Sequence, residues 1–209
     1  MKALIISLAS RVGGGAKIFR SSNNTGDRNQ WDSAPVLNPA STYQFNNLYI
    51  SAIDGKLYAT TGMNNGTAAK LYNSSDGTTW SEVAGFSAVS SYQYITGITE
   101  YNGKMYISVS QKLNYSPGGT VYVFDGASWS NVPGLPDIGY GDLVAFNNGT
   151  GEKLFIGDGN DIRTYDGTSN PVVNATLTDY TGYLTILTDG SKEWIYTGGT
   201  DVYYNPPCQ

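Results

Sequence analysis

Four tyrosines recur along the chain, each just before a short run of alternating apolar and polar residues. They are Tyr43, Tyr92, Tyr140 and Tyr180, at spacings of 49, 48 and 40 residues, and Gln44 and Gln93 follow two of them. A tyrosine offers a flat apolar face and a hydroxyl, and an amide both donates and accepts hydrogen bonds. Such side chains, gathered around one opening, could stack on a sugar ring and bind its hydroxyls. The alternative is that they only wedge neighbouring repeats together.

Loops that are predicted to open on the same face supply further candidates. They cover residues 10–15, 62–67, 111–119, 158–161 and 197–200. They differ in length, as expected where a binding protein carries specificity, and Tyr115 lies in the longest. Asp158, Asn160 and Asp161 offer three oxygen ligands within four residues, but no Glu follows at the spacing of a calcium-binding EF-hand. We therefore expect a solvated turn there, with a metal site as the weaker alternative.

No catalytic residue is predicted. The chain has no His, which excludes Ser–His and Cys–His arrangements and the usual zinc ligand sets. A glycosidase would need two carboxylates about 5–10 Å apart. The acidic residues expected on the inner side of the repeats have no partner that the sequence identifies. They are Asp54, Glu100, Asp142 and Asp158.

The charge of the chain limits its partners. The net charge is −5, and the 12 Lys and Arg residues are scattered. Clustered cations are needed to neutralise phosphates or to hold an anionic membrane, so neither nucleic acid nor a membrane is an expected partner. No cofactor is expected. Cys208, the single cysteine, cannot form a disulfide within the chain but could join two chains.

Internal repetition predicts how these residues are positioned. A tight turn followed by Lys and an apolar strand recurs at 52–62, 100–110, 149–159 and 188–198. Its Asp-Gly and Asn-Gly forms favour two-residue type I′ turns, because both central residues need positive φ. Short strands ending in an aromatic residue, and Trp-led strands, recur in the same order. Their markers are Phe19, Tyr72, Phe124, Tyr165 and Tyr204, and Trp31, Trp80 and Trp129. Each period thus contains four strands, A to D.

A four-stranded sheet repeated every 40–50 residues predicts an all-β chain with a β-propeller fold. We predict a single domain over 1–209 with five blades, whose cores lie near 1–37, 38–86, 87–135, 136–177 and 178–209. The first copy starts in strand B and the last stops after strand C, so the terminal blades have three strands. This alignment explains the start MKALIISLAS better than a signal peptide does. Terminal blades leave strand edges, through which the chain could self-associate.

The repeats resemble those of two propeller families. KMYISVSQ at 104–111, GTVYVFDGASWSNVPGLP at 119–136 and WIYTGGTDVYYN at 194–205 look like kelch repeats. YNSSDGTTWSEV at 72–83 resembles an Asp-box, Ser-x-Asp-x-Gly-x-Thr-Trp, with Gly77 directly after Asp76. Both resemblances imply a propeller, and neither fixes an activity. In Asp-box folds this turn lies away from the site, so we expect it to be structural, with Tyr72 and Trp80 packed in the blade.

The sequence therefore predicts a non-enzymatic binding or interaction module. A glycan or a protein segment would bind at the face formed by the D–A and B–C loops. A glycosidase- or sialidase-like enzyme is one alternative, and a fragment or mobile-element product of unknown function is another. With 14% charged residues, 26 Gly and 17 Tyr, the composition is typical of a secreted or cell-surface β protein, which favours an extracellular location.

Overall fold

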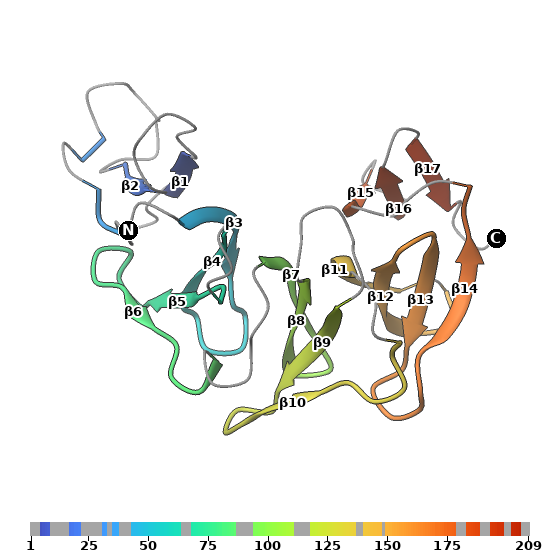
Figure 1. Ribbon diagram of the computed structural model, residues 1–209. Coiled ribbons are helices and arrows are strands. Elements are labelled where there is room, and N and C mark those ends of the chain that lie inside the picture. Colours follow the sequence, from blue (N-terminus) through green and yellow to red (C-terminus); the bar gives the residue numbers. More distant parts are fainter. Residues whose placement is uncertain are drawn as a thin grey trace. The chain divides into compact units, whose positions relative to one another are not determined.

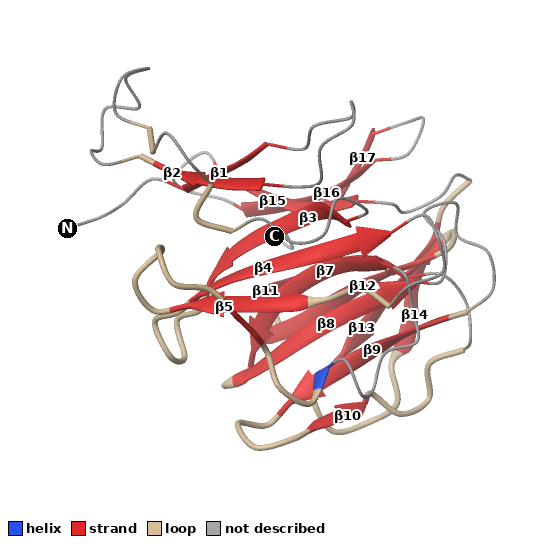
Figure 2. Cartoon of the chain, turned by 60° about the vertical axis from the view of Figure 1, so that its left-hand side comes forward, coloured by secondary structure: helices blue, strands red, loops and turns tan. Residues whose placement is uncertain are grey.

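The computed structural model describes residues 5–8, 17–21, 31–32, 35–37, 43–63, 68–86, 94–110, 118–136, 140–147, 149–178, 183–188, 193–198 and 202–205. Strands form nearly all of the regular structure in these ranges (Figure 2). The prediction of an all-β chain is thus confirmed. Two compact units divide the chain, residues 1–95 and residues 96–209.

The first unit is built from consecutive antiparallel strands (Figure 1). β1 (Ile5–Leu8) pairs with β2 (Lys17–Arg20). A four-stranded meander follows, with β3 (Tyr43–Ile50), β4 (Leu57–Met63), β5 (Leu71–Ser74) and β6 (Ser81–Glu82). Among the described residues of 31–37, where a strand was expected, only isolated bridges form, Ile18 to Leu37 and Ser21 to Trp31.

The same order of strands continues through the second unit. Its first meander has β7 (Tyr94–Tyr101), which starts in the last residues of the first unit, then β8 (Lys104–Ser110), β9 (Gly119–Phe124) and β10 (Trp129–Asn131). The next has β11 (Tyr140–Asn147), β12 (Glu152–Asp158), β13 (Asp161–Tyr165) and β14 (Val172–Thr176). The last described meander has β15 (Tyr183–Thr188), β16 (Glu193–Gly198) and β17 (Val202–Asn205).

Two hairpin turns that look alike in sequence differ in structure. Asn102 and Gly103 both have positive φ, 49° and 69°, so the predicted type I′ turn between β7 and β8 is confirmed. The Asp54-Gly55 turn is longer than predicted, because Ser51 N donates to Lys56 O at 2.9 Å and only Gly55 has positive φ. The carboxylate of Asp54 stabilises this wider loop by accepting from Lys56 N at 3.0 Å and from the Tyr58 hydroxyl at 2.9 Å.

The core of the first unit lies where β2 faces the β3–β6 meander. Ile18 is fully buried against Phe45 and Ala59, and Tyr72 and Trp80 pack around this cluster. The prediction that these two aromatic side chains pack the repeat is confirmed. Burying them is favourable, because apolar area removed from water contributes about 25 cal/mol per Å².

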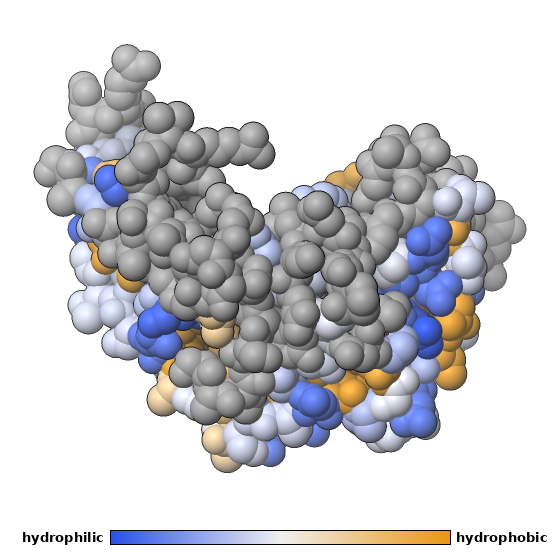
Figure 3. Space-filling model, viewed as in Figure 1, coloured by the Kyte–Doolittle hydropathy of each residue, from blue (hydrophilic) through white to orange (hydrophobic). Residues whose placement is uncertain are grey.

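The second unit contains two apolar clusters, one on each side of the β11–β14 meander. Successive residues of β11 point to opposite sides, so Leu143 packs in one cluster, with Tyr106 and Leu154, and Phe146 in the other, with Phe155. Within the second unit, the β11–β14 meander is therefore covered on one face by the meander before it and on the other by the meander after it. The outer strand β14 keeps hydrophobic surface exposed (Figure 3), with Val172 60% and Val173 47% accessible to solvent.

Candidate functional site

The first strand of a meander begins beside the end of its second strand. Tyr140 at the start of β11 pairs with Asp158 at the end of β12, and Tyr43 at the start of β3 pairs with Met63 at the end of β4. The D–A and B–C connections therefore open at this end, which we call the loop face. Two of the predicted tyrosines thus stand at the loop face of their own units.

The structure describes the predicted ligand contacts to different extents. The strand positions of Tyr43, Gln44 and Tyr140 are described, but their side chains are not. A second group lies outside the described residues altogether. It comprises Tyr92, Gln93, Tyr115 and Tyr180. A ring of tyrosines at the loop face therefore stays a prediction.

A buried ion pair lies at the loop face of the second unit. The side chain of Asp158 is 0% exposed, and that of Arg163 on β13 is 17% exposed. The Nε group of Arg163 donates to the Asp158 carboxylate. Burial raises the pKa of Asp158, and the hydrogen bond and charge of Arg163 oppose this shift. The charge and the hydrogen bond of Arg163 therefore compensate for the hydration that the Asp158 carboxylate loses on burial.

The neighbouring turn extends this group of polar side chains. Asp161 lies 3.7 Å from the Nη2 atom of Arg163, and its other carboxylate oxygen accepts from the Thr176 hydroxyl at 2.6 Å. Gly159 has a φ of 59° and starts a two-residue turn between Asp158 and Asp161. The backbone of Asn160 accepts from Leu177 N at 2.7 Å. The sequence predicted a solvated turn here, but the Asp158 side chain is fully buried and paired with Arg163.

The described residues contain no group of three His, Cys, Asp or Glu side chains placed to hold a metal ion. In the Asp158-Asn160-Asp161 segment, the carboxylates of both aspartates face the guanidinium of Arg163. A cation bound there would compete with this internal cation.

A second carboxyl group with a shifted pKa belongs to Asp142, two residues after the start of β11. Burial raises the pKa of Asp142 to about 6, although the backbone N–H groups of Leu143 and Leu184 donate to the carboxylate and oppose the shift. Desolvation disfavours the charged form, and among the described residues no cation contributes to compensate it. Four acidic residues were predicted on the inner side of the repeats, and two of them, Asp142 and Asp158, have raised pKa values. Although burial acts to raise it, the pKa of Asp54 is lowered, because hydrogen bonds from the groups of its turn outweigh the effect of burial.

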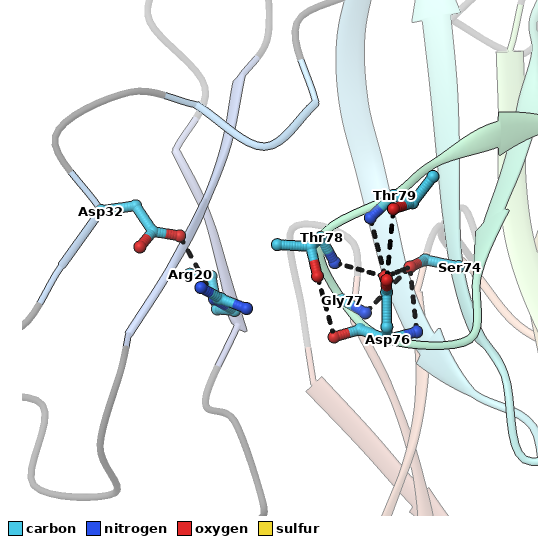
Figure 4. Close-up of polar contacts among 7 residues, drawn as sticks. All are labelled: Arg20, Asp32, Ser74, Asp76, Gly77, Thr78 and Thr79. Atoms are coloured by element: carbon cyan, nitrogen blue, oxygen red, sulfur yellow. Dashed lines mark hydrogen bonds and ion pairs between the residues drawn. The ribbon is translucent and has the colours of Figure 1, made fainter.

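In three of the meanders, the turn between the third and fourth strands contains an exposed aspartate whose carboxylate accepts hydrogen bonds from the backbone. The Oδ1 atom of Asp76 accepts from Thr78 N and Thr79 N, both at 2.7 Å (Figure 4). Asp125 and Asp166 repeat this arrangement, with distances of 2.8–2.9 Å. The glycine after each aspartate has positive φ. The Asp76-Gly77 turn is therefore formed as the sequence predicted, and its carboxylate is used by the backbone.

Sequence reasoning did not identify Arg163 and Thr176 as parts of the loop face. A signal was present, since Asp161 and Arg163 are two residues apart on a strand and so share one side of it. An aspartate that ends an apolar strand, as Asp158 does, also calls for a nearby cation. What the sequence could not supply was the pairing of β13 with β14 that brings Thr176 opposite Asp161.

A membrane-spanning helix would need an apolar run of about 20 residues, and the described part of the chain contains no such helix. No protein-family model and no curated protein matches the sequence.

Comparison with solved structures identifies the fold. A candidate gluconolactonase is 11% identical, with a TM-score of 0.60 over 91% of this chain and 67% of that chain. A Bombyx mori GH32 beta-fructofuranosidase is 13% identical, with a TM-score of 0.49 over 93% of this chain and 52% of that chain. A mutant Aleuria aurantia lectin in complex with alpha-methyl-L-fucoside is 18% identical, with a TM-score of 0.46 over 98% of this chain and 71% of that chain. These neighbours have propeller-like folds, and the first likeness shows that this chain has one too.

Proposed function

We propose that the chain is a glycan-binding module whose ligand contacts the loop face of the second unit. The observation that supports this most directly is the position of Arg163, between the carboxylates of Asp158 and Asp161 at a turn that opens on this face. The guanidinium has five N–H donors in one plane, so its orientation by two carboxylates leaves further donors for sugar hydroxyls. Side chains that are already ordered cost less free energy to fix on binding.

Aromatic side chains complete the proposed site. Tyr140 begins β11 next to Asp158 in the pairing register, and we place Tyr115 and Tyr180 on the same face from the repeat pattern. Sugar recognition combines stacking on such rings with directed hydrogen bonds. In the first unit, Tyr43 and Gln44 stand at the corresponding strand end. A protein segment is the other ligand class that this surface could take.

A glycoside-cleaving enzyme is the second candidate. It is favoured by burial of the Asp142 and Asp158 carboxyls on the paired strands β11 and β12, which raises both pKa values. A general acid works best when its pKa lies near the working pH. Binding without cleavage is preferred, because backbone N–H groups and Arg163 already engage these carboxylates.

The proposal is tested on a glycan array with the labelled chain. We expect binding to a restricted set of glycans, which is lost in Tyr140→Ala and weakened at least tenfold in Arg163→Lys. Lysine keeps the charge but not the planar fork. Thr168→Ala, in the β13–β14 turn, is the matched control and should bind as the parent does. Failure to bind any glycan would count against the proposal, and steady release of product from fluorogenic glycosides would favour the enzyme.

A further inference from the structure

A bulge in β11 directs Asp142 toward the neighbouring first strands. Tyr140 pairs with Asp158 and Leu143 pairs with Ile156, so Gly141 and Asp142 together stand opposite the single residue Gly157. A bulge of this kind leaves one residue out of the ladder and re-aims its side chain. β11 also packs against β8 on one side and β15 on the other. The bulge therefore lies where consecutive meanders meet near the loop face.

Hydrogen bonds link the strands at this point. The Asp142 carboxylate accepts from Leu143 N at 2.8 Å and from the backbone N–H of Leu184 on β15. On the other side, the Ser108 hydroxyl of β8 donates to Gly141 O at 2.6 Å and lies 3.0 Å from the Thr96 hydroxyl of β7. One carboxylate thus joins β11 to β15, and one hydroxyl joins β11 to β8.

Gly97 on β7 provides the space that this arrangement needs. A Cβ atom built on Gly97 would lie 2.7 Å from Oδ1 of Asp142, 2.8 Å from Leu143 N and 2.8 Å from Oγ of Ser108. Its φ lies outside the left-handed region, so a lack of room, and not the backbone conformation, requires glycine here. The carboxylate is therefore packed closely on a side where no larger residue fits.

The charged groups of the surrounding strands do not cause the rise in the pKa of Asp142. On β7 the titratable groups are Tyr94, Glu100 and Tyr101, on β8 Lys104 and Tyr106, on β12 Glu152, Lys153 and Asp158, and on β15 Tyr183. In the described part of the chain, only burial and the two backbone hydrogen bonds act on the pKa of Asp142. Its protonation therefore responds to the local packing of β11 and β15.

We propose that Asp142 is a proton-sensitive positioning residue of the loop face. As a neutral acid it fits its buried position, keeps a carboxyl oxygen as the acceptor for the Leu184 N–H and holds the start of β15 against β11. When it loses its proton to solvent, a charge is left in the packed site with no cation among the described residues to compensate it, which disfavours the packed arrangement. The start of β15 then loosens, and the loop face loses its binding geometry as the pH rises toward neutral. The last step rests on the proposed glycan-binding function, whereas the first three do not.

The test follows backbone amides of the full chain, labelled with ¹⁵N, between pH 4.5 and 8. We expect the Leu143 and Leu184 amide shifts to titrate together with a midpoint near pH 6. Exchange protection of the Leu184 amide, corrected for intrinsic chemistry, should be at least threefold higher at pH 5 than at pH 7.5. In Asp142→Asn both effects should vanish, because the amide cannot titrate, and Asp166→Asn should retain them.

Two results would overturn the proposal. One is a Leu184 amide that titrates identically in the parent and in Asp142→Asn, and the other is a parent amide without an inflection between pH 4.5 and 7.5. If Gly97→Ala folds, it should displace the carboxylate and shift the midpoint by at least half a pH unit. These readouts need no ligand, so absence of glycan binding alongside a normal titration would refute the proposed function and leave Asp142 in its role.

Discussion

The guanidinium of Arg163 donates to the carboxylate of Asp158, a side chain with no exposure to solvent. The two residues lie on the adjacent strands β12 and β13, on either side of a two-residue turn. A buried charge is tolerated only when a partner compensates its lost hydration. The pair therefore fixes the orientation of the guanidinium beside the turn, which is why the proposed site is centred on it.

Removal of Arg163 should be costly. Arg163→Gln leaves the Asp158 carboxylate buried without its cation, so we expect the free energy of unfolding to fall by about 3–5 kcal/mol at pH 7. The pKa of Asp158 should rise further, since Arg163 is the group that lowers it. Urea unfolding measures the loss. The double variant Asp158→Asn/Arg163→Gln should recover much of it, and equal instability of the single and double variants would contradict the role of the pair.

Asp142 should make the stability of the chain fall as the pH rises. The folded-state pKa is about 6 and the ordinary value is 3.8. Between these values the folded state keeps a proton that the unfolded state has lost, so stability is full below about pH 4 and is lost by about pH 7. Asp142→Asn removes the charge, so its stability relative to the parent should increase over this window, by up to about 3 kcal/mol. Thermal unfolding at pH 4, 5.5 and 7.5 measures this, and a constant difference would count against the shift.

Asp166 should act in the opposite direction. Hydrogen bonds from Ser169 N and Thr168 N lower its pKa to about 2. Its contribution to stability is present above the ordinary value of 3.8 and is lost as the pH falls toward 2. Asp166→Asn keeps the acceptor but not the charge, so it should unfold less steeply between pH 4 and 2 than the parent does. An unchanged acid-unfolding curve would show that the turn carboxylate contributes nothing in solution.

Much of the fold, and less of the site, could be predicted from the sequence. The four-strand order was readable because turn residues and aromatic strand ends recur at fixed intervals, as at Asn102-Gly103 and Trp129. The wider loop at Asp54-Gly55 could not be predicted, because it depends on a hydrogen bond between Ser51 and Lys56, which lie outside the Asp-Gly dipeptide. A repeated sequence pattern predicts only the features that all the repeats have in common.

The features that make one meander differ from the others could not be predicted from the sequence. Arg163 lies in only one of the repeats, and the β11 bulge that buries Asp142 depends on how Gly141 and Gly157 meet across two strands. Its acidity also depends on Leu184, which is 42 residues further along the chain. Such contacts arise from packing between repeats, which a periodic pattern predicts in kind but not in detail.

Packing between the last two described meanders should dominate the stability of that part of the chain. Phe155 is 1% exposed, meets Phe146 edge-on with ring centroids 5.9 Å apart, and packs in one cluster with Leu184 and Ile195 of the last described meander. Phe155→Ala should therefore lower the free energy of unfolding by about 3–5 kcal/mol. Val172→Ala, on the exposed side of β14, should change it by no more than about 0.5 kcal/mol. Urea denaturation of both variants provides the comparison, and similar losses would contradict the assigned core.

The central claim is that sugars bind at the loop face of the second unit. Its most direct test is an NMR titration of the ¹⁵N-labelled chain with D-galactose, D-mannose, N-acetyl-D-glucosamine and L-fucose. At least one sugar should shift the amides of Asp158–Asp161 and Gly141–Asp142 and leave those of Thr168 and Ser169 unchanged. Shifts confined to the β13–β14 turn, or none with any of these sugars, would contradict the claim.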